Sequence, residues 1–289
     1  MCEFKRNRSN FYLKIRNNTN CINLYANEMV MHLLNIIARE LVDSSPIGWR
    51  ESRNYSYLYN LWIPNDKLDK ELLQYVIDWC EYANSYIWLS TNKNTRDFFD
   101  GNEIDFCLAL DWNYDLYKKN RTPLGEAEYQ LKYQLPKGYL ETNDAKKFKK
   151  ALKTALYSSI ECLPFDIQDF LVTTIPAVEE KQDKLSWKMA EWVSKKYNID
   201  FLKATLSITK PQMKEQKVEN KIQIWREIYR EPSNIYLSHN ITGRNILIVD
   251  DLYQSGASIW CYAEMLKSLK ANVVIAVTSV KSLRDGDNT

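Results

Sequence analysis

The feature that most constrains this chain is residues 245–258, where an apolar run leads into two acids and then a small polar turn. The segment reads Asn-Ile-Leu-Ile-Val-Asp-Asp-Leu-Tyr-Gln-Ser-Gly-Ala-Ser. Four consecutive apolar residues predict a strand buried on both faces, and the small polar residues predict a turn into a helix over residues 257–270. Ligands of open α/β sheets bind at the carboxyl ends of strands, so Asp250 and Asp251 are candidate ligand contacts.

The chain from residue 104 onward alternates between strand-like and helix-like segments. We predict strands over residues 104–112, 170–178, 201–208, 245–251 and 272–280. We predict helices over residues 121–134, 143–157, 183–197 and 257–270, and a charged stretch over 209–229 that becomes helical late. Such alternation predicts an α/β domain over residues 104–289, with a mostly parallel sheet flanked by helices.

Residues 1–103 have a different pattern, which predicts an N-terminal α+β extension. Apolar residues at helical spacing predict a helix over 22–41, and a second helix capped by Asn65 or Asp66 follows a strand over 56–63. Another short strand is expected over 85–90, whereas residues 2–18 suit either a strand or a loose arm. The many aromatic residues suit a core or a recognition surface. This region could therefore cover a binding site of the second domain, as a hood, or contact a protein partner.

Composition excludes several classes of protein. The net charge is only +2, so no strong overall field draws the chain to nucleic acid or membrane. The six cysteines form no Cys-x-x-Cys pair and the two histidines are far apart, so no zinc site is expected. Free thiols suit a reducing cytoplasm, and no apolar run approaches the roughly 20 residues needed to span a bilayer. We therefore expect a cytoplasmic protein without a membrane partner.

The residues that follow the predicted strand suit a sugar phosphate. Asp250 and Asp251 can accept hydrogen bonds from a ribose diol, and Gly256 allows the backbone to approach a phosphate closely. Serine hydroxyls, backbone amides and the helix N-terminus can donate hydrogen bonds to the phosphate. The predicted phosphate-binding set is Gln254, Ser255, Gly256, Ala257 and Ser258.

This pattern resembles the phosphoribosyl pyrophosphate (PRPP) motif of type I phosphoribosyltransferases, in which an apolar strand, two acids and three variable residues precede Thr-Gly-x-Thr. Serine replaces both threonines here, which keeps the hydroxyl donors. The surrounding sequence, over about residues 104–289, resembles the branch typified by the competence protein ComF. Residues 173–178 match its pyrophosphate loop, residues 210–217 its basic flexible loop, and Lys132 with Tyr133 its Lys-Tyr element.

The resemblance implies roles for individual residues. Pro176, Ala177, Lys210 and Lys214 would bind pyrophosphate, and the two lysines would neutralise it as it departs. Asp250 and Asp251 would hold the ribose hydroxyls, directly or through water on Mg²⁺. Residues 179–183, Glu-Glu-Lys-Gln-Asp, depart from the Arg-Gly-Phe-Asn-Gln-like segment of that branch. Two acids beside pyrophosphate are unfavourable unless Mg²⁺ or lysines compensate.

Three functions remain open at this stage. The first is a transferase that moves the 5-phosphoribosyl group of PRPP, with Mg²⁺, to a nitrogen nucleophile and releases pyrophosphate. The second is a regulator that binds PRPP or a nucleotide with reduced or no turnover. The third is an effector subunit of a nucleic-acid-processing or anti-phage system, engaged through residues 1–103. The sequence identifies neither the acceptor nor the number of subunits, and a homo-oligomer is compatible with all three.

Overall fold

The computed structural model describes residues 2–178, 184–209, 211, 213 and 216–283. The chain divides into two compact units, residues 1–88 with 162–165 and residues 89–161 with 166–289. The division falls after Trp88, whereas the sequence placed the boundary after residue 103. Residues 162–165 belong with the first unit, where the indole of Trp79 donates to the carbonyl of Cys162 at 3.1 Å.

The first unit contains a five-stranded antiparallel sheet. Its strands are β1 (Cys2–Lys5), β2 (Tyr12–Asn17), β3 (Cys21–Ala26), β4 (Trp49–Glu51) and β5 (Tyr59–Pro64), in the order β1-β2-β3-β5-β4. Of the two alternatives for residues 2–18, the structure shows the ordered one, as two paired strands. The sheet buries Leu13, Ile15, Leu24 and Leu61 on one face.

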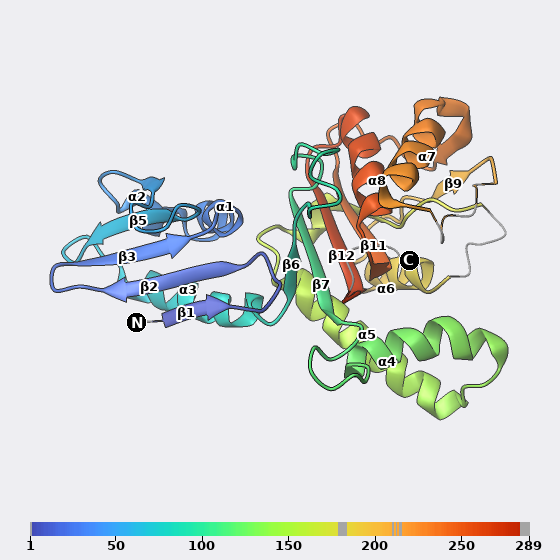
Figure 1. The fold of residues 1–289 in the computed structure, drawn as a ribbon, viewed down its shortest axis with the longest axis horizontal. Helices are drawn as coiled ribbons and strands as arrows, with labels where there is room; N and C mark the ends of the chain where they lie inside the picture. The colour runs from blue at the N-terminus through green and yellow to red at the C-terminus, as the bar shows by residue number, and fades with distance from the viewer. Residues whose placement is uncertain (1, 179–183, 210, 212, 214–215, 284–289) are drawn as a thin grey trace. The chain divides into compact units, whose positions relative to one another are not determined.

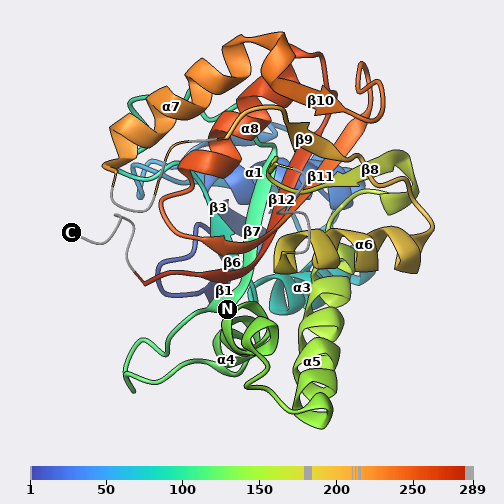
Figure 2. The same cartoon turned by 90° about the vertical axis from the view of Figure 1, so that its right-hand side faces the viewer.

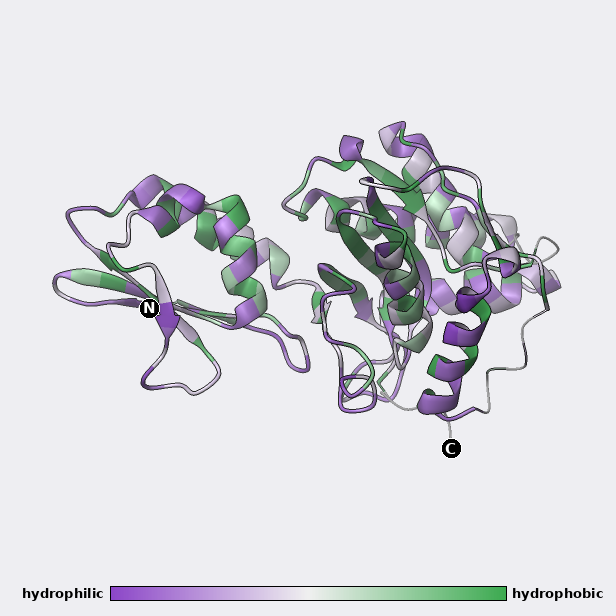
Figure 3. Cartoon of the chain, turned by 90° about the horizontal axis from the view of Figure 1, so that it is seen from above, coloured by the Kyte–Doolittle hydropathy of each residue, from purple (hydrophilic) through white to green (hydrophobic). Residues whose placement is uncertain are grey.

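The helices of this unit lie on one side of the sheet, as Figure 3 shows. They are α1 (Glu28–Ile37), α2 (Arg39–Asp43) and α3 (Lys70–Ala83). The helix predicted over residues 22–41 was wrong for its first residues, which form β3 because Ile22, Leu24 and Ala26 alternate toward the core. Asn27 then caps α1. Helix α3 is capped by Asp69, not by Asn65 or Asp66.

The second unit contains a mostly parallel sheet, which confirms the predicted α/β class (Figure 1). Its order is β6-β7-β12-β11-β8, and the division of the chain after Trp88 falls within the edge strand β6. The pairs β7–β12, β12–β11 and β11–β8 are parallel. A two-stranded antiparallel sheet joins β9 to β10. The strands are β6 (Ile87–Leu89), β7 (Phe106–Trp112), β8 (Phe170–Thr173), β9 (Ala204–Leu206), β10 (Ile235–Leu237), β11 (Asn245–Tyr253) and β12 (Val274–Lys281).

Helices flank this sheet, and Figure 2 shows α4 beside α5 and α7 beside α8. Their bounds are α4 (Pro123–Tyr129), α5 (Thr142–Glu161), α6 (Leu185–Tyr197), α7 (Val218–Arg230) and α8 (Ala257–Ser268). A π-helical turn, η1 (Gln130–Gln134), continues α4. No helix in the described ranges is both long and apolar enough to cross a membrane.

The strand predicted over residues 170–178 is shorter than expected. Strand β8 ends at Thr173, and the chain then leaves β11 and forms a parallel bridge from Ala177 to Thr205 of β9. The last pair between β8 and β11 is Thr173 with Ile248. On its other side β11 stays paired with β12 up to Tyr253 and Lys281. The carboxyl half of β11 therefore loses its β8 neighbour where the two acids occur.

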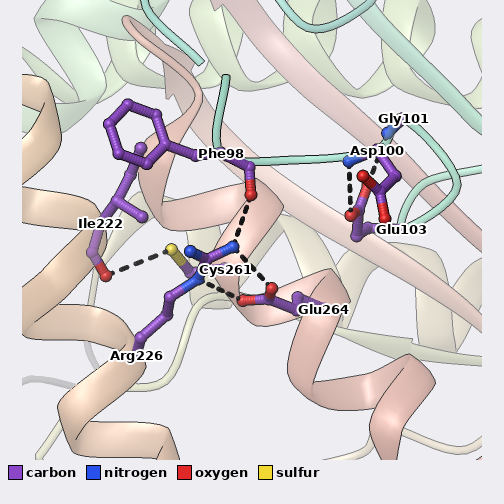
Figure 4. Close-up of polar contacts among 8 residues, drawn as sticks. All are labelled: Phe98, Asp100, Gly101, Glu103, Ile222, Arg226, Cys261 and Glu264. Carbon is purple, nitrogen blue, oxygen red and sulfur yellow. Dashed lines mark hydrogen bonds and ion pairs between the residues drawn. The ribbon is translucent and has the colours of Figure 1, made fainter. Parts of the chain in front are cut away.

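Contacts between α7, α8 and the segment before β7 fix helix α8 in place (Figure 4). The Arg226 guanidinium binds both carboxylate oxygens of Glu264, at 2.7 and 2.9 Å, and donates to the carbonyl of Phe98 at 2.6 Å. Glu103 accepts from the amides of Asp100 and Gly101 in the same segment. A two-point Arg–carboxylate contact is geometrically specific, so it holds the helix that begins at the candidate site.

Candidate functional site

Asp250 and Asp251 lie within β11 rather than after it. Pairing with β12 continues past both residues, and Asp250 is paired with Thr278. Successive side chains of a strand point to opposite faces, so the two carboxylates leave the sheet in opposite directions. Both lie in the part of β11 that has no β8 partner, which is the edge where open α/β sheets bind ligands.

Asp251 is held by a lysine from the π-helical turn η1. The Lys132 ammonium lies 2.8 Å from a carboxylate oxygen of Asp251 and 3.3 Å from a carboxylate oxygen of Glu128. Asp251 is only 9% exposed and Glu128 only 4%, so one cation serves two buried acids. Glu128 and Lys132 are one helical turn apart, which lets both side chains reach the same face.

Burial and neighbouring charges shift the pKa values of Lys132 and Glu128 in this cluster. Burial alone would lower the pKa of the Lys132 ammonium, but Asp251 and Glu128 outweigh it and raise that pKa. Lys132 therefore stays charged. Burial raises the pKa of Glu128, and the nearby Lys132 opposes the shift.

Asp250 has an environment that favours its protonated form. Loss of solvent and the neighbouring Asp251 charge raise the pKa of Asp250 from 3.8 to about 7, against the opposing charges of Lys132 and Lys184. The site thus contains one lysine-paired acid and one acid that titrates near neutral pH. A bound cation would favour the charged form of Asp250.

We expect stability to fall as pH rises across the titration of Asp250. A raised acid pKa means that the folded state binds more protons than the unfolded state between pH 3.8 and about 7. The stabilisation is therefore present in acid and lost as pH rises toward 7. Asp250→Asn should raise the melting temperature at pH 8 by several degrees and flatten its pH dependence. Differential scanning fluorimetry across this range tests this, and Asp97→Asn, an exposed acid, should behave like the wild type.

The loop after β11 is built around Gly256, which caps α8. Its φ is +85°, and a Cβ at this position would lie 2.2 Å from the hydroxyl of Tyr253. That hydroxyl accepts a hydrogen bond from the indole of Trp260 at 2.9 Å. Gly256 thus allows a left-handed turn and close contact with a buried tyrosine, and α8 begins directly after it.

The predicted phosphate-binding side chains are also held by other groups. The Ser258 hydroxyl accepts from the indole of Trp225 at 2.9 Å, and the Ser255 hydroxyl accepts from the amide of Ala257 at 3.4 Å. The ammonium of Lys281 donates to the carbonyl of Gln254 at 3.2 Å. An accepting hydroxyl can still donate its own hydrogen, so both serines keep a donor for a ligand.

The structure describes only part of the predicted pyrophosphate site. Pro176 is buried after β8, and Ala177 is tied to β9 through its bridge to Thr205. Lys210, Lys214, the acidic segment 179–183 and residues 284–289 lie outside the described residues. Among the described residues no cluster of three or more His, Cys, Asp or Glu side chains is arranged for a metal.

Two residues at the site were given no specific role by the sequence. Glu128 and Lys132 have the i, i+4 spacing of a helical ion pair, which is a detectable signal, but their partner Asp251 is 119 residues from Lys132. Trp112, close to the site in sequence, is only 4% exposed and belongs to the core. Tyr117 is 83% exposed, and Tyr114 lies under the guanidinium of Arg121 at 4.7 Å.

These features define a class of protein, namely an α/β protein with a parallel sheet, two acids at its ligand-binding edge and a glycine-capped helix N-terminus beside them. Helix N-termini bind anions through free amides and the helix dipole. The site therefore suits a ligand that combines hydroxyl groups with a phosphate.

Comparison with known proteins identifies no family for the whole chain. No family model matches it, and no curated protein matches it. Solved structures that align with part of it include three phosphoribosyltransferases. A hypoxanthine phosphoribosyltransferase of Staphylococcus aureus is 14% identical, with 48% of this chain and 66% of that chain aligned and a TM-score of 0.31. An adenine phosphoribosyltransferase of Thermoanaerobacter pseudethanolicus is 13% identical, with 50% of this chain and 86% of that chain aligned and a TM-score of 0.31. A hypoxanthine-guanine phosphoribosyltransferase of Bacillus anthracis is 19% identical, with 48% of this chain and 73% of that chain aligned and a TM-score of 0.28.

The alignment spans slightly less than two thirds of the first of these chains. TM-scores near 0.3 are too low for a superposition to assign a ligand or a reaction. The ComF-like branch expected from the sequence has no support from these comparisons. The function proposed below therefore depends on the residues of the site.

Proposed function

We propose that this chain binds PRPP with Mg²⁺ at the carboxyl end of β11 and transfers its 5-phosphoribosyl group to a nitrogen nucleophile. The observation that supports this most is the continuous path from Asp250 and Asp251, through the left-handed Gly256, to the N-terminus of α8. The acids suit the ribose hydroxyls, and the helix amides suit the 5′-phosphate. One segment of chain thereby supplies both halves of a ribose-phosphate site.

The acids of the site would repel an anionic ligand if they were all fully charged and unpaired, but neighbouring groups reduce their negative charge. Lys132 offsets Asp251 and Glu128, and Asp250 has a pKa raised to about 7 by burial and by Asp251, so its negative charge is partial at neutral pH. Mg²⁺ commonly binds through one or two carboxylates together with phosphate oxygens and water. Asp250 fits that role, and the ion would supply charge that stabilises departing pyrophosphate.

In the proposed reaction the bond from the ribose anomeric carbon to pyrophosphate breaks and a bond to the acceptor nitrogen forms. The nitrogen loses a proton to solvent. The chain would contribute position and electrostatics, with Asp250 and Asp251 holding the ribose and the α8 amides holding its phosphate. Lys210 and Lys214 remain the proposed pyrophosphate contacts.

A second candidate function is binding of PRPP or a nucleotide without turnover, as a regulator or an effector subunit. Two observations favour it. Asp251 is already engaged by Lys132, and Ser255 and Ala257 in the loop are only 4% and 2% exposed. A loop packed this tightly suits a site that senses its ligand. Both candidates share the same ribose-phosphate site.

Release of pyrophosphate distinguishes the two functions. The full chain is incubated with PRPP and Mg²⁺ and with adenine, hypoxanthine, guanine, uracil, orotate or nicotinamide, and pyrophosphate is measured by a coupled enzyme assay. A transferase should release pyrophosphate with at least one acceptor and lose about 10²-fold or more of that rate in Asp250→Asn. Asp97→Asn should keep the rate. Saturable PRPP binding without release from any acceptor would favour the regulator.

A further inference from the structure

The first unit has a sheet face that its own helices do not cover. Figure 3 shows α1, α2 and α3 on one side of this sheet, and the described residues of this unit place no helix on the other. Pairing across the strands defines what this outer face presents. One row crosses all five strands as Glu3, Lys14, Tyr25, Asn60 and Arg50. The next row contains Arg16, Asn23 and Trp62.

Charge is segregated between the two sides of this unit. The outer face carries four basic side chains and one acid, namely Lys5, Lys14, Arg16, Arg50 and Glu3. Lys14 pairs with Glu3 at 3.3 Å, so Lys5, Arg16 and Arg50 supply the excess positive charge. The three helices on the other side carry six acids and two basic residues, namely Glu28, Glu40, Asp43, Glu71, Asp78, Glu81, Arg39 and Lys70. The net charge of the whole chain, +2, conceals this difference. The outer face is therefore suited to a negatively charged partner.

Aromatic and planar groups accompany the basic ones. The Arg16 guanidinium lies 5.6 Å from the ring centre of Tyr25 and 5.9 Å from that of Tyr55, and it donates to the Tyr55 hydroxyl at 2.8 Å. Tyr55 belongs to the loop between β4 and β5, and Tyr57 in that loop is 73% exposed. Trp62 is half-buried on the face itself. Tyr25 is only 8% exposed and packs against the Tyr55 ring at 5.5 Å, so Tyr57 and Trp62 are the aromatic groups that can stack on planar rings.

We infer that the outer face of this sheet binds single-stranded nucleic acid. Proteins that hold single strands combine basic side chains for the phosphates with aromatic side chains on which bases stack. The face supplies both, because Lys5 and Arg50 are exposed for phosphates, and Trp62 with Tyr57 of the adjoining loop is available for bases. An acidic protein segment would use the lysines and arginines but would leave the exposed aromatic groups without ring partners. The inference is independent of the ribose-phosphate site, because it uses none of its residues.

The test is fluorescence anisotropy of the full chain with labelled single-stranded RNA and DNA of about 16 nucleotides. Wild type should bind with a dissociation constant of roughly 10⁻⁶–10⁻⁴ M that weakens as salt rises. Arg50→Glu and Trp62→Ala should each weaken binding roughly tenfold. Lys70→Glu makes the same change of charge on the helix side and should leave binding unchanged. The ratio of RNA to DNA affinity then identifies the preferred strand.

Several results would overturn the inference. One is the lack of saturable binding to either single strand at about 10⁻⁴ M protein. Another is equal weakening by Lys70→Glu and Arg50→Glu. A third is equal affinity for a duplex of the same length, or equal competition by poly-glutamate, because either would show a face that accepts any polyanion. Arg50 is exposed, so its variant remains informative if Trp62→Ala fails to fold.

Discussion

Lys132→Met is expected to lower the free energy of unfolding by about 3 kcal/mol, because it leaves two buried acids without their cation. Lys132 is 2.8 Å from Asp251 and 3.3 Å from Glu128, and the exposed fractions of those two acidic side chains are 12% and 5%. The Lys132 side chain itself is a quarter exposed, which places the estimate at the lower end of the range for buried pairs. Methionine is unbranched and one heavy atom shorter than lysine, so it keeps most of the apolar stem and removes the ammonium group.

Urea denaturation of the wild type and the variant measures this loss. Lys137→Met is the matched control, because Lys137 follows in the next helical turn and is exposed. Its effect should stay within about 0.5 kcal/mol. Adding Glu128→Gln to Lys132→Met should recover part of the loss, since one unpaired charge is then gone. Equal stability of Lys132→Met and wild type would show that the lysine does not support the site.

Gly256→Ala is expected to cost about 2–5 kcal/mol of folding free energy. An alanine at φ +85° costs about 1–2 kcal/mol, and the new methyl group would lie 2.2 Å from the Tyr253 hydroxyl, which adds about 1–3 kcal/mol of overpacking. Tyr253 is 1% exposed and bonded to Trp260, so it has little room to move.

Gly138→Ala separates the two contributions to this cost. Gly138 also has a positive φ, +73°, but a Cβ there meets nothing within 4 Å. Its substitution should therefore cost only the backbone share, about 1–2 kcal/mol. The comparison uses urea denaturation of both variants. Equal losses at the two glycines would mean that contact with Tyr253 contributes nothing, and that the loop is looser than the structure shows.

The sequence predicted the strands and helices of the second unit better than those of the first unit. Buried strands such as Ile246–Val249 are continuous apolar runs, and the change to helical spacing after Gly256 is clear. In the first unit, Ile22, Leu24 and Ala26 alternate as in a strand, but they run directly into the apolar spacing of α1, and the Asn27 cap marks the boundary between them. Strand β4, with three residues, is too short to give a pattern.

The site could be located from sequence because its acids and its glycine are neighbours in the chain. The lysine that offsets Asp251 could not be assigned, because Lys132 lies 119 residues earlier and only the packing of η1 beside β11 brings them together. The hydrogen bond from Trp225 to Ser258 also joins different helices. Local motifs thus predicted where the acids, the glycine turn and the start of α8 lie, whereas the groups that set the charge and rigidity of this loop depend on tertiary contacts.

The central claim is that the end of β11 and the start of α8 form a ribose-phosphate site. Isothermal titration of Mg²⁺ and PRPP into the wild type, the Asp250→Asn/Asp251→Asn double variant and the Asp97→Asn control tests it most directly. The account predicts saturable binding to wild type and control, with affinity at least tenfold weaker in the double variant whose circular dichroism is unchanged. Equal PRPP affinity in the folded double variant, or no binding to wild type at millimolar PRPP, would contradict it.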